Sequence, residues 1–236
     1  MWLSGLGDFP SLVRDNLSRA SNPGVYMRVV TDWNRYHKRT RISQNFLWTI
    51  WRAYSDLLRG IHFKEPIKII ELGCGTAYHT LQMTKLFPVD KVTLVDFNPN
   101  VLNAAQKRLS GLNCEKEFLL RDLFNLDLTE KYDIVHSQGL LEHYTPDEQQ
   151  KLICLHRDLL TPNGITIILV PTPSLPYRLW RGLLEKLHLW IYPDETAISE
   201  EQFSAELKYS GLQILKMKKC HLIELGAVCR RGSGYL

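Results

Sequence analysis

Long hydrophobic runs are missing from this sequence of 236 residues. The most apolar segment, Ile165 to Val170, has the length of one strand, whereas a helix that spans a bilayer needs about 20 apolar residues. The first residues, MWLSGLGDFP, lack the basic and long apolar regions of a secretory signal. Cysteine is scarce as well: there are five, an odd number without a CxxC pair, which disfavours a disulfide framework and a zinc ribbon. We therefore expect a reduced, cytoplasmic protein that is neither exported nor embedded in a membrane.

A strong charge of one sign is also absent. The formal net charge is +4, from 29 Lys and Arg against 25 Asp and Glu, which is too small to require a nucleic-acid partner. The charge is uneven, however, because residues 1–66 hold ten basic and five acidic side chains. The basic excess of the chain therefore lies in its N-terminal segment.

From residue 67 onward, short β-branched runs alternate with helical patterns. The expected strands are 67–72, 91–97, 115–122, 132–138 and 164–172, and the expected helices are 78–87, 98–110, 145–160 and 199–211. Such alternation is typical of a parallel sheet, and continuous apolar runs indicate strands covered on both faces. After residue 211 two further β-rich runs follow without a helix between them, which predicts an antiparallel hairpin. The sequence therefore predicts an α/β fold with a doubly wound, mostly parallel, seven-stranded sheet.

The segment before the sheet contains one clear amphipathic helix, 44–60, which ends at Gly60. Its apolar face is formed by Leu47, Ile50, Trp51, Tyr54, Leu57 and Leu58. One face of this helix needs a partner, which we expect to be the sheet. We predict an N-terminal helical cap over residues 1–65 and a second domain over 66–236, with a lid-like insertion at 173–197.

A glycine turn follows the first strand, in the sequence ELGCGTA from Glu71 to Ala77. Glycines at this point let the backbone approach a ligand closely. A dinucleotide fingerprint would have its third glycine at Tyr78, so NAD is disfavoured. Glu71, Asp96 and Asp122 are acidic residues at the ends of three consecutive strands, a rim that repels a pyrophosphate but suits a cofactor with a cationic amino acid and a sulfonium.

In this combination the residues resemble the class I S-adenosylmethionine-dependent methyltransferases, which have a Rossmann-like fold. The resemblance covers roughly residues 66–230, and it departs from the family at Ala77, where a third glycine is common. It implies that Glu71, Gly73 and Gly75 wrap the methionine part of S-adenosylmethionine, with Gln138 beside it, and that Asp96 holds the ribose. It also implies that Phe97 lies against the adenine, that Asp122 and the backbone of Leu123 read the adenine edge, and that Tyr36 reaches the cofactor carboxylate from the N-terminal segment.

The best candidate for a catalytic base is His143, because an imidazole titrates near neutral pH. It follows the fourth strand in the sequence LLEHY, beside Glu142. The alternative is that this Glu-His pair only packs the loop, as in many members of the family. Some relatives bind a divalent metal through an ExxEH cluster, but position 139 is Gly here, so we expect no metal.

The segment 173–193 is too apolar for an ordinary loop, with five leucines and a tryptophan among its residues 179–189. It could be a lid over an apolar acceptor, a dimer contact, or a peripheral membrane contact through 177–192. We favour the lid, and with it methyl transfer to a small, hydrophobic or aromatic acceptor by O-, N- or C-methylation. The alternatives are an RNA or protein methyltransferase that uses the basic N-terminal segment, and a catalytically silent binding partner with the same fold. A nicotinamide oxidoreductase is disfavoured further because no YxxxK pair is present. Oligomeric state and acceptor identity are left open by the sequence.

Overall fold

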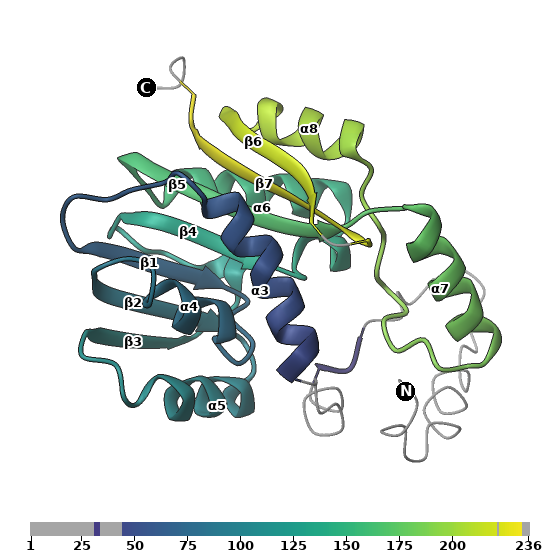
Figure 1. Ribbon diagram of the computed structural model, residues 1–236, viewed down its shortest axis with the longest axis horizontal. Helices are drawn as coiled ribbons and strands as arrows, with labels where there is room; N and C mark the ends of the chain where they lie inside the picture. Colours follow the sequence, from purple (N-terminus) through teal and green to yellow (C-terminus); the bar gives the residue numbers. More distant parts are fainter. Residues whose placement is uncertain (1–30, 34–43, 221, 233–236) are drawn as a thin grey trace.

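The computed structural model describes residues 31–33, 44–220 and 222–232. Its centre is one seven-stranded sheet with the strand order β3-β2-β1-β4-β5-β7-β6 (Figure 1). The five strands β1 to β5 pair in parallel, and β7 pairs antiparallel with both β5 and β6. The predicted mixed sheet with its C-terminal hairpin is confirmed. The strands are β1 (Ile67–Leu72), β2 (Val89–Asp96), β3 (Glu115–Leu120), β4 (Tyr132–Gln138), β5 (Leu160–Pro171), β6 (Leu212–Cys220) and β7 (Glu224–Arg231).

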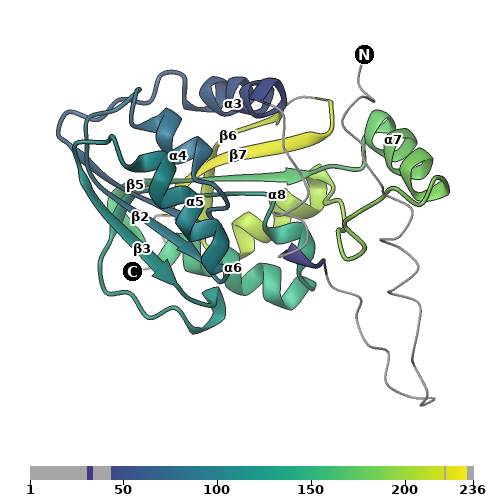
Figure 2. The ribbon, with the colours of Figure 1, turned by 90° about the horizontal axis from the view of Figure 1, so that it is seen from below.

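Helices cover both faces of this sheet, as the continuous apolar strands require (Figure 2). One face packs against α3 (Gln44–Leu58), α4 (Tyr78–Met83) and α5 (Pro99–Leu109), and the other against α6 (Pro146–Asp158) and α8 (Glu200–Tyr209). Two hydrophobic clusters result, one on each face. Short 3-10 turns, η1 (Leu123–Asn125) and η2 (Leu141–His143), follow β3 and β4.

Helix α3 confirms the amphipathic helix predicted before the sheet. Tyr54 and Leu57 are fully buried, and the helix contacts β6, β7 and α4. It ends ahead of Gly60, which has a φ of +84°, and the Lys216 ammonium of β6 donates to the carbonyl oxygens of Leu57 and Arg59. The helix is thus fixed to the far edge of the sheet. A separate cap over residues 1–65 stays a prediction, because residues 1–30 and 34–43 lie outside the described part.

The start of β5 differs from the prediction. The strand was expected to begin at Gly164, after the turn residues Pro162 and Asn163, but it begins at Leu160. Tyr132 pairs with Leu160 whereas Ile134 pairs with Ile165, so the intervening residues form a bulge in the ladder. Glycine is needed at 164, where a Cβ would lie 2.8 Å from the carbonyl oxygen of Tyr132. The bulge therefore keeps the turn residues inside the strand.

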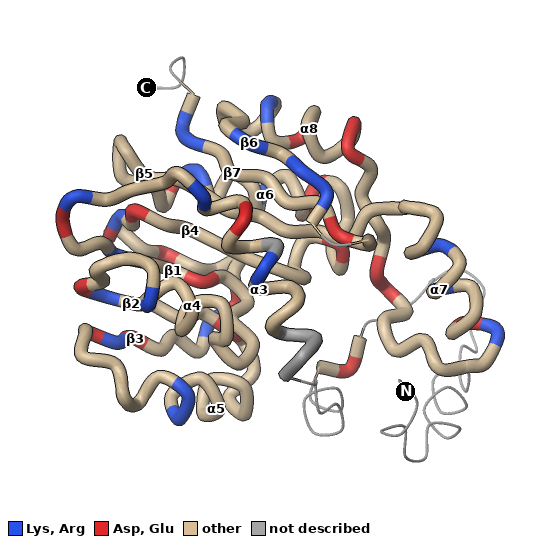
Figure 3. Tube along the Cα trace, in the orientation of Figure 1, with Lys and Arg blue, Asp and Glu red and all other residues tan. Residues whose placement is uncertain are grey.

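The predicted insertion contains one helix, α7 (Leu175–Lys186), which stands beside the rest of the fold (Figures 1 and 2). Its buried side chain is Tyr177, while large apolar side chains point outward: Leu175, Leu179, Trp180 and Leu183 are 48% to 68% exposed. Charges of both signs lie on the same helix (Figure 3). None of the helices in the described ranges combines the length and hydropathy that a membrane crossing requires.

Candidate functional site

Three neighbouring parallel strands end at one edge of the sheet, and each brings an acidic residue there. Glu71 lies in β1, Asp96 ends β2, and Asp122 follows β3 by two residues. Because β3, β2 and β1 are adjacent and parallel, these carboxyl groups share one rim. This arrangement matches the sequence prediction.

The glycine turn between β1 and α4 crosses this rim. Gly73, Gly75 and Ala77 have φ values of +65°, +50° and +54°, a left-handed conformation that glycine adopts without strain. A Cβ at Gly73 would lie 3.0 Å from Cδ1 of Leu140, whereas a Cβ at Gly75 would meet nothing within 4 Å. The left-handed φ favours glycine at 73, where a Cβ would also press on the end of the Leu140 side chain, and Gly75 borders open space. Ala77 keeps the backbone of a third glycine although it carries a side chain.

Asp96 holds this turn in place. One oxygen of its carboxylate accepts from the backbone N–H of Gly75 at 3.1 Å, and the other accepts from the N–H of Asn98 at 2.9 Å. Burial raises the pKa of Asp96, and the backbone donors oppose that rise. A carboxylate offers about four acceptor sites, so each oxygen can still accept another hydrogen bond. The next residue, Phe97, is 55% exposed and presents its ring at the rim.

Asp122 and Leu123 form the third side. The Asp122 carboxylate caps η1 by accepting from the backbone N–H of Phe124 at 3.0 Å and from the side-chain amide of Asn125 at 3.3 Å. The side chain of Leu123 is buried in the hydrophobic cluster on the sheet face that α6 and α8 cover, while that of Asp122 is exposed. The turn therefore fixes the backbone of both residues at the rim.

Glu71 differs from the other two acids because it is only 4% exposed. Burial raises its pKa to about 8, against the opposing effect of the Thr80 hydroxyl, which donates to Oε2 at 2.6 Å. Such a carboxyl group gains from a cationic partner, because a positive charge offsets the cost of its desolvation.

Gln138, at the end of β4, has a partner that sequence reasoning missed. Its amide nitrogen donates to Oε1 of Glu224 at 2.9 Å, and burial raises the pKa of Glu224 to about 7. Glu224 begins β7, 86 residues later. The edge hairpin therefore orients Gln138 at the rim.

His143 is held by a carboxylate that follows α7. Its Nδ1 lies 3.0 Å from Oδ1 of Asp194, which also accepts from the hydroxyl of Thr31, while Oδ2 accepts from the Thr31 N–H at 3.0 Å. Burial alone lowers the pKa of His143, but the hydrogen bond to Asp194 and the charge of Glu142 outweigh it, so the pKa is raised. The same bonds lower the pKa of Asp194 to about 2, against the effect of burial. The pair has the arrangement of a base and its orienting carboxylate.

Aromatic rings surround this imidazole. Trp33 meets it edge-on at a centroid distance of 4.8 Å, and Tyr192 lies at 5.9 Å. Trp190 continues the contact from Tyr192 to Tyr177 of α7. The insertion 173–197 thus reaches the candidate base through its aromatic residues and through Asp194.

Glu142, His143 and Glu195 place three ligand atoms within 4.8 Å of one another, a set that could hold a divalent cation. Glu195 supplies the second carboxylate although Gly occupies position 139, and no local sequence pattern signals this contribution. Oε1 of Glu195 accepts from the hydroxyl of Tyr177 at 2.6 Å. The expectation of a metal-free site stays a prediction.

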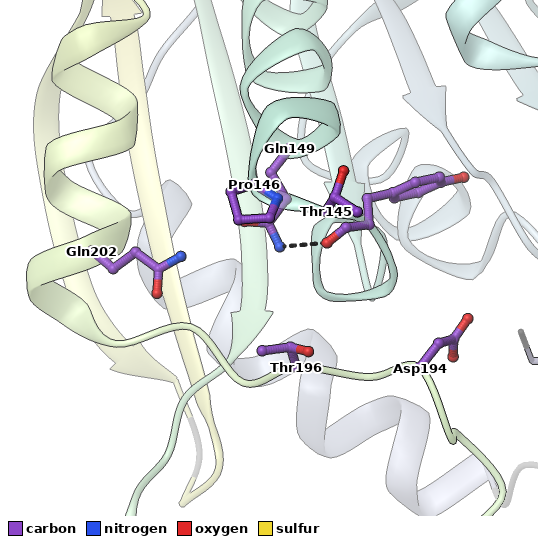
Figure 4. Close-up of a pocket in the computed structure, with 7 residues that line it drawn as sticks. Thr145, Pro146, Gln149, Asp194, Thr196 and Gln202 are labelled. Atoms are coloured by element: carbon purple, nitrogen blue, oxygen red, sulfur yellow. Dashed lines mark hydrogen bonds between the residues drawn. The ribbon is translucent and has the colours of Figure 1, made fainter. Parts of the chain in front are cut away.

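A pocket of about 260 Å³ opens beside Asp194, the partner of His143, between the start of α6 and the segment 194–196 (Figure 4). Thr145, Pro146 and Gln149 lie on one side, and Asp194 and Thr196 on the other. Gln149 closes one wall by donating to the carbonyl oxygen of Tyr144 at 3.0 Å. None of the residues proposed for the cofactor lines this pocket.

One predicted site residue, Tyr36, lies outside the described residues, so its role stays a prediction. The residues that sequence reasoning missed are the partners of the predicted ones: Thr80, Asp194 and Glu224. Thr80 lies four residues after the ELGCGT turn, so its nearness to Glu71 in the sequence could have identified it as a partner. The other two come from distant segments that carry no motif.

Comparison with known proteins is consistent with this geometry. Residues 69–164 match the family described as methyltransferase domain. Two similar relatives are malonyl-[acyl-carrier protein] O-methyltransferases. The one from Bacillus cereus is 41% identical over 76 residues, 32% of this chain and 28% of the relative. The one from Bacillus anthracis is 32% identical over 102 residues, 43% of this chain and 35% of the relative. The matches thus span about a third of the length of these relatives.

Solved structures share the fold at low sequence identity. The DhpI–SAH complex has a TM-score of 0.66 at 20% identity, over 85% of this chain and 95% of that one. The 1,6-didemethyltoxoflavin-N1-methyltransferase of Burkholderia thailandensis has a TM-score of 0.65 at 17% identity, over 86% of each chain. The family match over residues 69–164 and the strand order agree with the Rossmann-like fold of a class I, S-adenosylmethionine-dependent methyltransferase.

Proposed function

We propose that this protein transfers the methyl group of S-adenosylmethionine to a small, apolar or aromatic acceptor. The observation that supports this most directly is the rim itself. A buried acid, a glycine turn beside open space, and two further acids lie on adjacent strand ends of a methyltransferase fold. The curated relatives are named for a malonyl-carrier acceptor, but the short overlap leaves the acceptor of this chain to be found by experiment.

The residues at the rim fit each part of the cofactor. The Glu71 carboxylate can pair with the ammonium group, and Asp96 has acceptor sites left for ribose hydroxyls after holding Gly75 and Asn98. Phe97 offers an exposed ring face for the adenine. Asp122 and the backbone of Leu123 complete the adenine side, and Gln138 flanks the methionine part.

Bound S-adenosylmethionine supplies an activated methyl group whose bond to sulfur breaks as the acceptor forms its new bond to carbon. The chain contributes alignment, exclusion of water and removal of the acceptor proton. His143 takes this proton on its imidazole, and Asp194 holds the ring and stabilises the resulting charge. Because the pKa of His143 is raised, we expect kcat to increase with pH through a midpoint above 6.5, the ordinary value.

Aromatic residues favour an apolar acceptor over a nucleic acid. Trp33, Trp190 and Tyr192 are grouped beside His143, and we propose that the insertion that carries two of them acts as a lid. Peripheral membrane binding and dimer formation through the outward face of α7 are the competing roles.

The first test is calorimetric titration with S-adenosylhomocysteine, with NAD as the control ligand. We expect S-adenosylhomocysteine to bind and NAD not to bind, and Asp96→Ala to weaken binding about tenfold or more because the ribose loses charged acceptors. Unchanged affinity in Asp96→Ala would refute the site. Incubation with radiolabelled S-adenosylmethionine and a panel of phenols, amines and fatty acids, beside bulk tRNA, then separates a small-molecule enzyme from an RNA methyltransferase and from a silent binding protein.

A further inference from the structure

Beneath the rim, a chain of buried hydrogen bonds joins α3 to Glu71. The hydroxyl of Tyr54 lies 3.1 Å from Nδ1 of His136, and Nε2 of His136 lies 3.1 Å from the hydroxyl oxygen of Thr80. Thr80 in turn lies 2.6 Å from Oε2 of Glu71. The four residues come from α3, β4, α4 and β1, and none is more than 4% exposed.

The direction of each bond follows from counting protons in the state that pairs with the cofactor ammonium group, in which Glu71 is ionised. The Thr80 hydroxyl has one proton, which it donates to the carboxylate. Its oxygen must therefore accept from Nε2–H of His136. Burial holds the pKa of His136 well below its ordinary value, so the ring is neutral and Nδ1 is an acceptor for the Tyr54 hydroxyl. Every donor then points toward Glu71.

Packing leaves Tyr54 little freedom to turn away. Its ring stacks on that of His79 at 4.7 Å and on that of Trp51 at 6.2 Å, and it meets His136 edge-on at 5.9 Å. A second acceptor, the carbonyl oxygen of Ser137, lies farther from the hydroxyl, at 3.4 Å. The stacked rings thus fix one end of the hydrogen-bond chain, and Glu71 is fixed at the other.

We propose that Tyr54 and His136 are positioning residues that act through Thr80 to hold the Glu71 carboxylate in place for the ammonium group of the cofactor. This inference rests on the function proposed above and extends it to α3, which precedes the family match at residues 69–164. Donors fixed in advance lower the cost of ordering a carboxylate when the ligand arrives. Helix α3 therefore belongs to the cofactor site although it lies outside the matched region.

The experiment measures two ligands by calorimetry: S-adenosylhomocysteine, which carries the ammonium group, and 5′-methylthioadenosine, which lacks the amino-acid part. The variants are Tyr54→Phe and Thr80→Val, each of which removes one hydroxyl at nearly constant volume. We expect Thr80→Val to weaken S-adenosylhomocysteine about tenfold, the lower range for a hydrogen bond to a charged group, and Tyr54→Phe to weaken it about two- to tenfold, the range for a bond between neutral groups. Methylthioadenosine should be unchanged in both.

Two controls separate positioning from general damage. Thr80→Ser keeps the hydroxyl and should restore affinity, while Thr84→Val removes a hydroxyl on the same side of the fold, where Thr84 donates only to the Leu81 carbonyl, and should change neither affinity. Equal loss of both ligands in Tyr54→Phe and Thr80→Val, or loss of neither, would overturn the positioning role. Failure of the wild-type protein to bind S-adenosylhomocysteine would instead overturn the proposed function, and the inference with it.

Discussion

The substitution Gly75→Ala adds one methyl group to the glycine turn. Its effect on stability reports the backbone strain of the turn, and its effect on affinity reports the contact of the turn with the cofactor. Gly75 has a φ of +50°, and a Cβ there would meet nothing within 4 Å. The left-handed conformation costs a residue with a Cβ about 1–2 kcal/mol, and about 0.4–1 kcal/mol of this is offset because alanine restricts the unfolded chain. The net loss for Gly75→Ala is then about 1 kcal/mol, or roughly 2–4 °C in Tm for a chain of this size.

The matched control is Gly60→Ala. Gly60 follows α3, has a φ of +84°, and would also place its Cβ in open space, so its stability loss should be similar. Only the space beside Gly75 is proposed to hold the methionine part, so only Gly75→Ala should weaken S-adenosylhomocysteine, by about tenfold or more for an overpacked contact. Denaturant unfolding and calorimetry measure the two quantities. Wild-type affinity in Gly75→Ala would refute the close approach of this turn to the cofactor.

Further predictions concern pH, the base and α7. The free energy of unfolding should fall from about pH 6.5 to 8, because the folded protein keeps protons that the unfolded chain releases. Below pH 6.5 the buried histidines act in the opposite direction. Denaturant titrations that show a rise in the free energy of unfolding between pH 6.5 and 8 would contradict this prediction. The groups concerned are Glu71 and Glu142, each with a pKa of about 8, and Glu224 with a pKa of about 7, opposed by His79 and His156 with pKa values of about 4. Asp194→Asn should lower kcat roughly 10- to 100-fold and move its pH midpoint down, with the affinity for S-adenosylhomocysteine unchanged; an unaltered pH profile would remove His143 from the reaction. Trp180→Ser should leave the free energy of unfolding within about 0.5 kcal/mol of the wild-type value and raise KM for an apolar acceptor, as a lid requires. If the variant instead no longer sediments with lipid vesicles as the wild type does, α7 binds a membrane; if it loses a dimer peak that the wild type shows in size-exclusion chromatography, α7 contacts a second subunit.

Much of the fold could be predicted from the sequence because its signals are local. The bounds of β1 and β4 match the predicted ranges, since each strand is a short segment built around adjacent β-branched residues, Ile69 and Ile70 in β1 and Ile134 and Val135 in β4. The rim of Glu71, Asp96 and Asp122 was predictable as well, because parallel topology brings the ends of consecutive strands to one edge. The bulge at the start of β5 was not, since it depends on which residue of β4 lies opposite.

The partners of the site residues were decided by tertiary structure alone. Asp194 reaches His143 across 51 residues, and Tyr54 reaches His136 across 82. Contacts between residues so far apart in the chain produce no recognisable spacing pattern in the sequence, because they form only after helices and loops pack onto the sheet. Local sequence patterns are thus enough to predict the sheet and the residues at its ligand-binding edge. Only folding decided which buried neighbours set their charge and orientation, since burial and hydrogen bonding shift a pKa through the surroundings of a group in space.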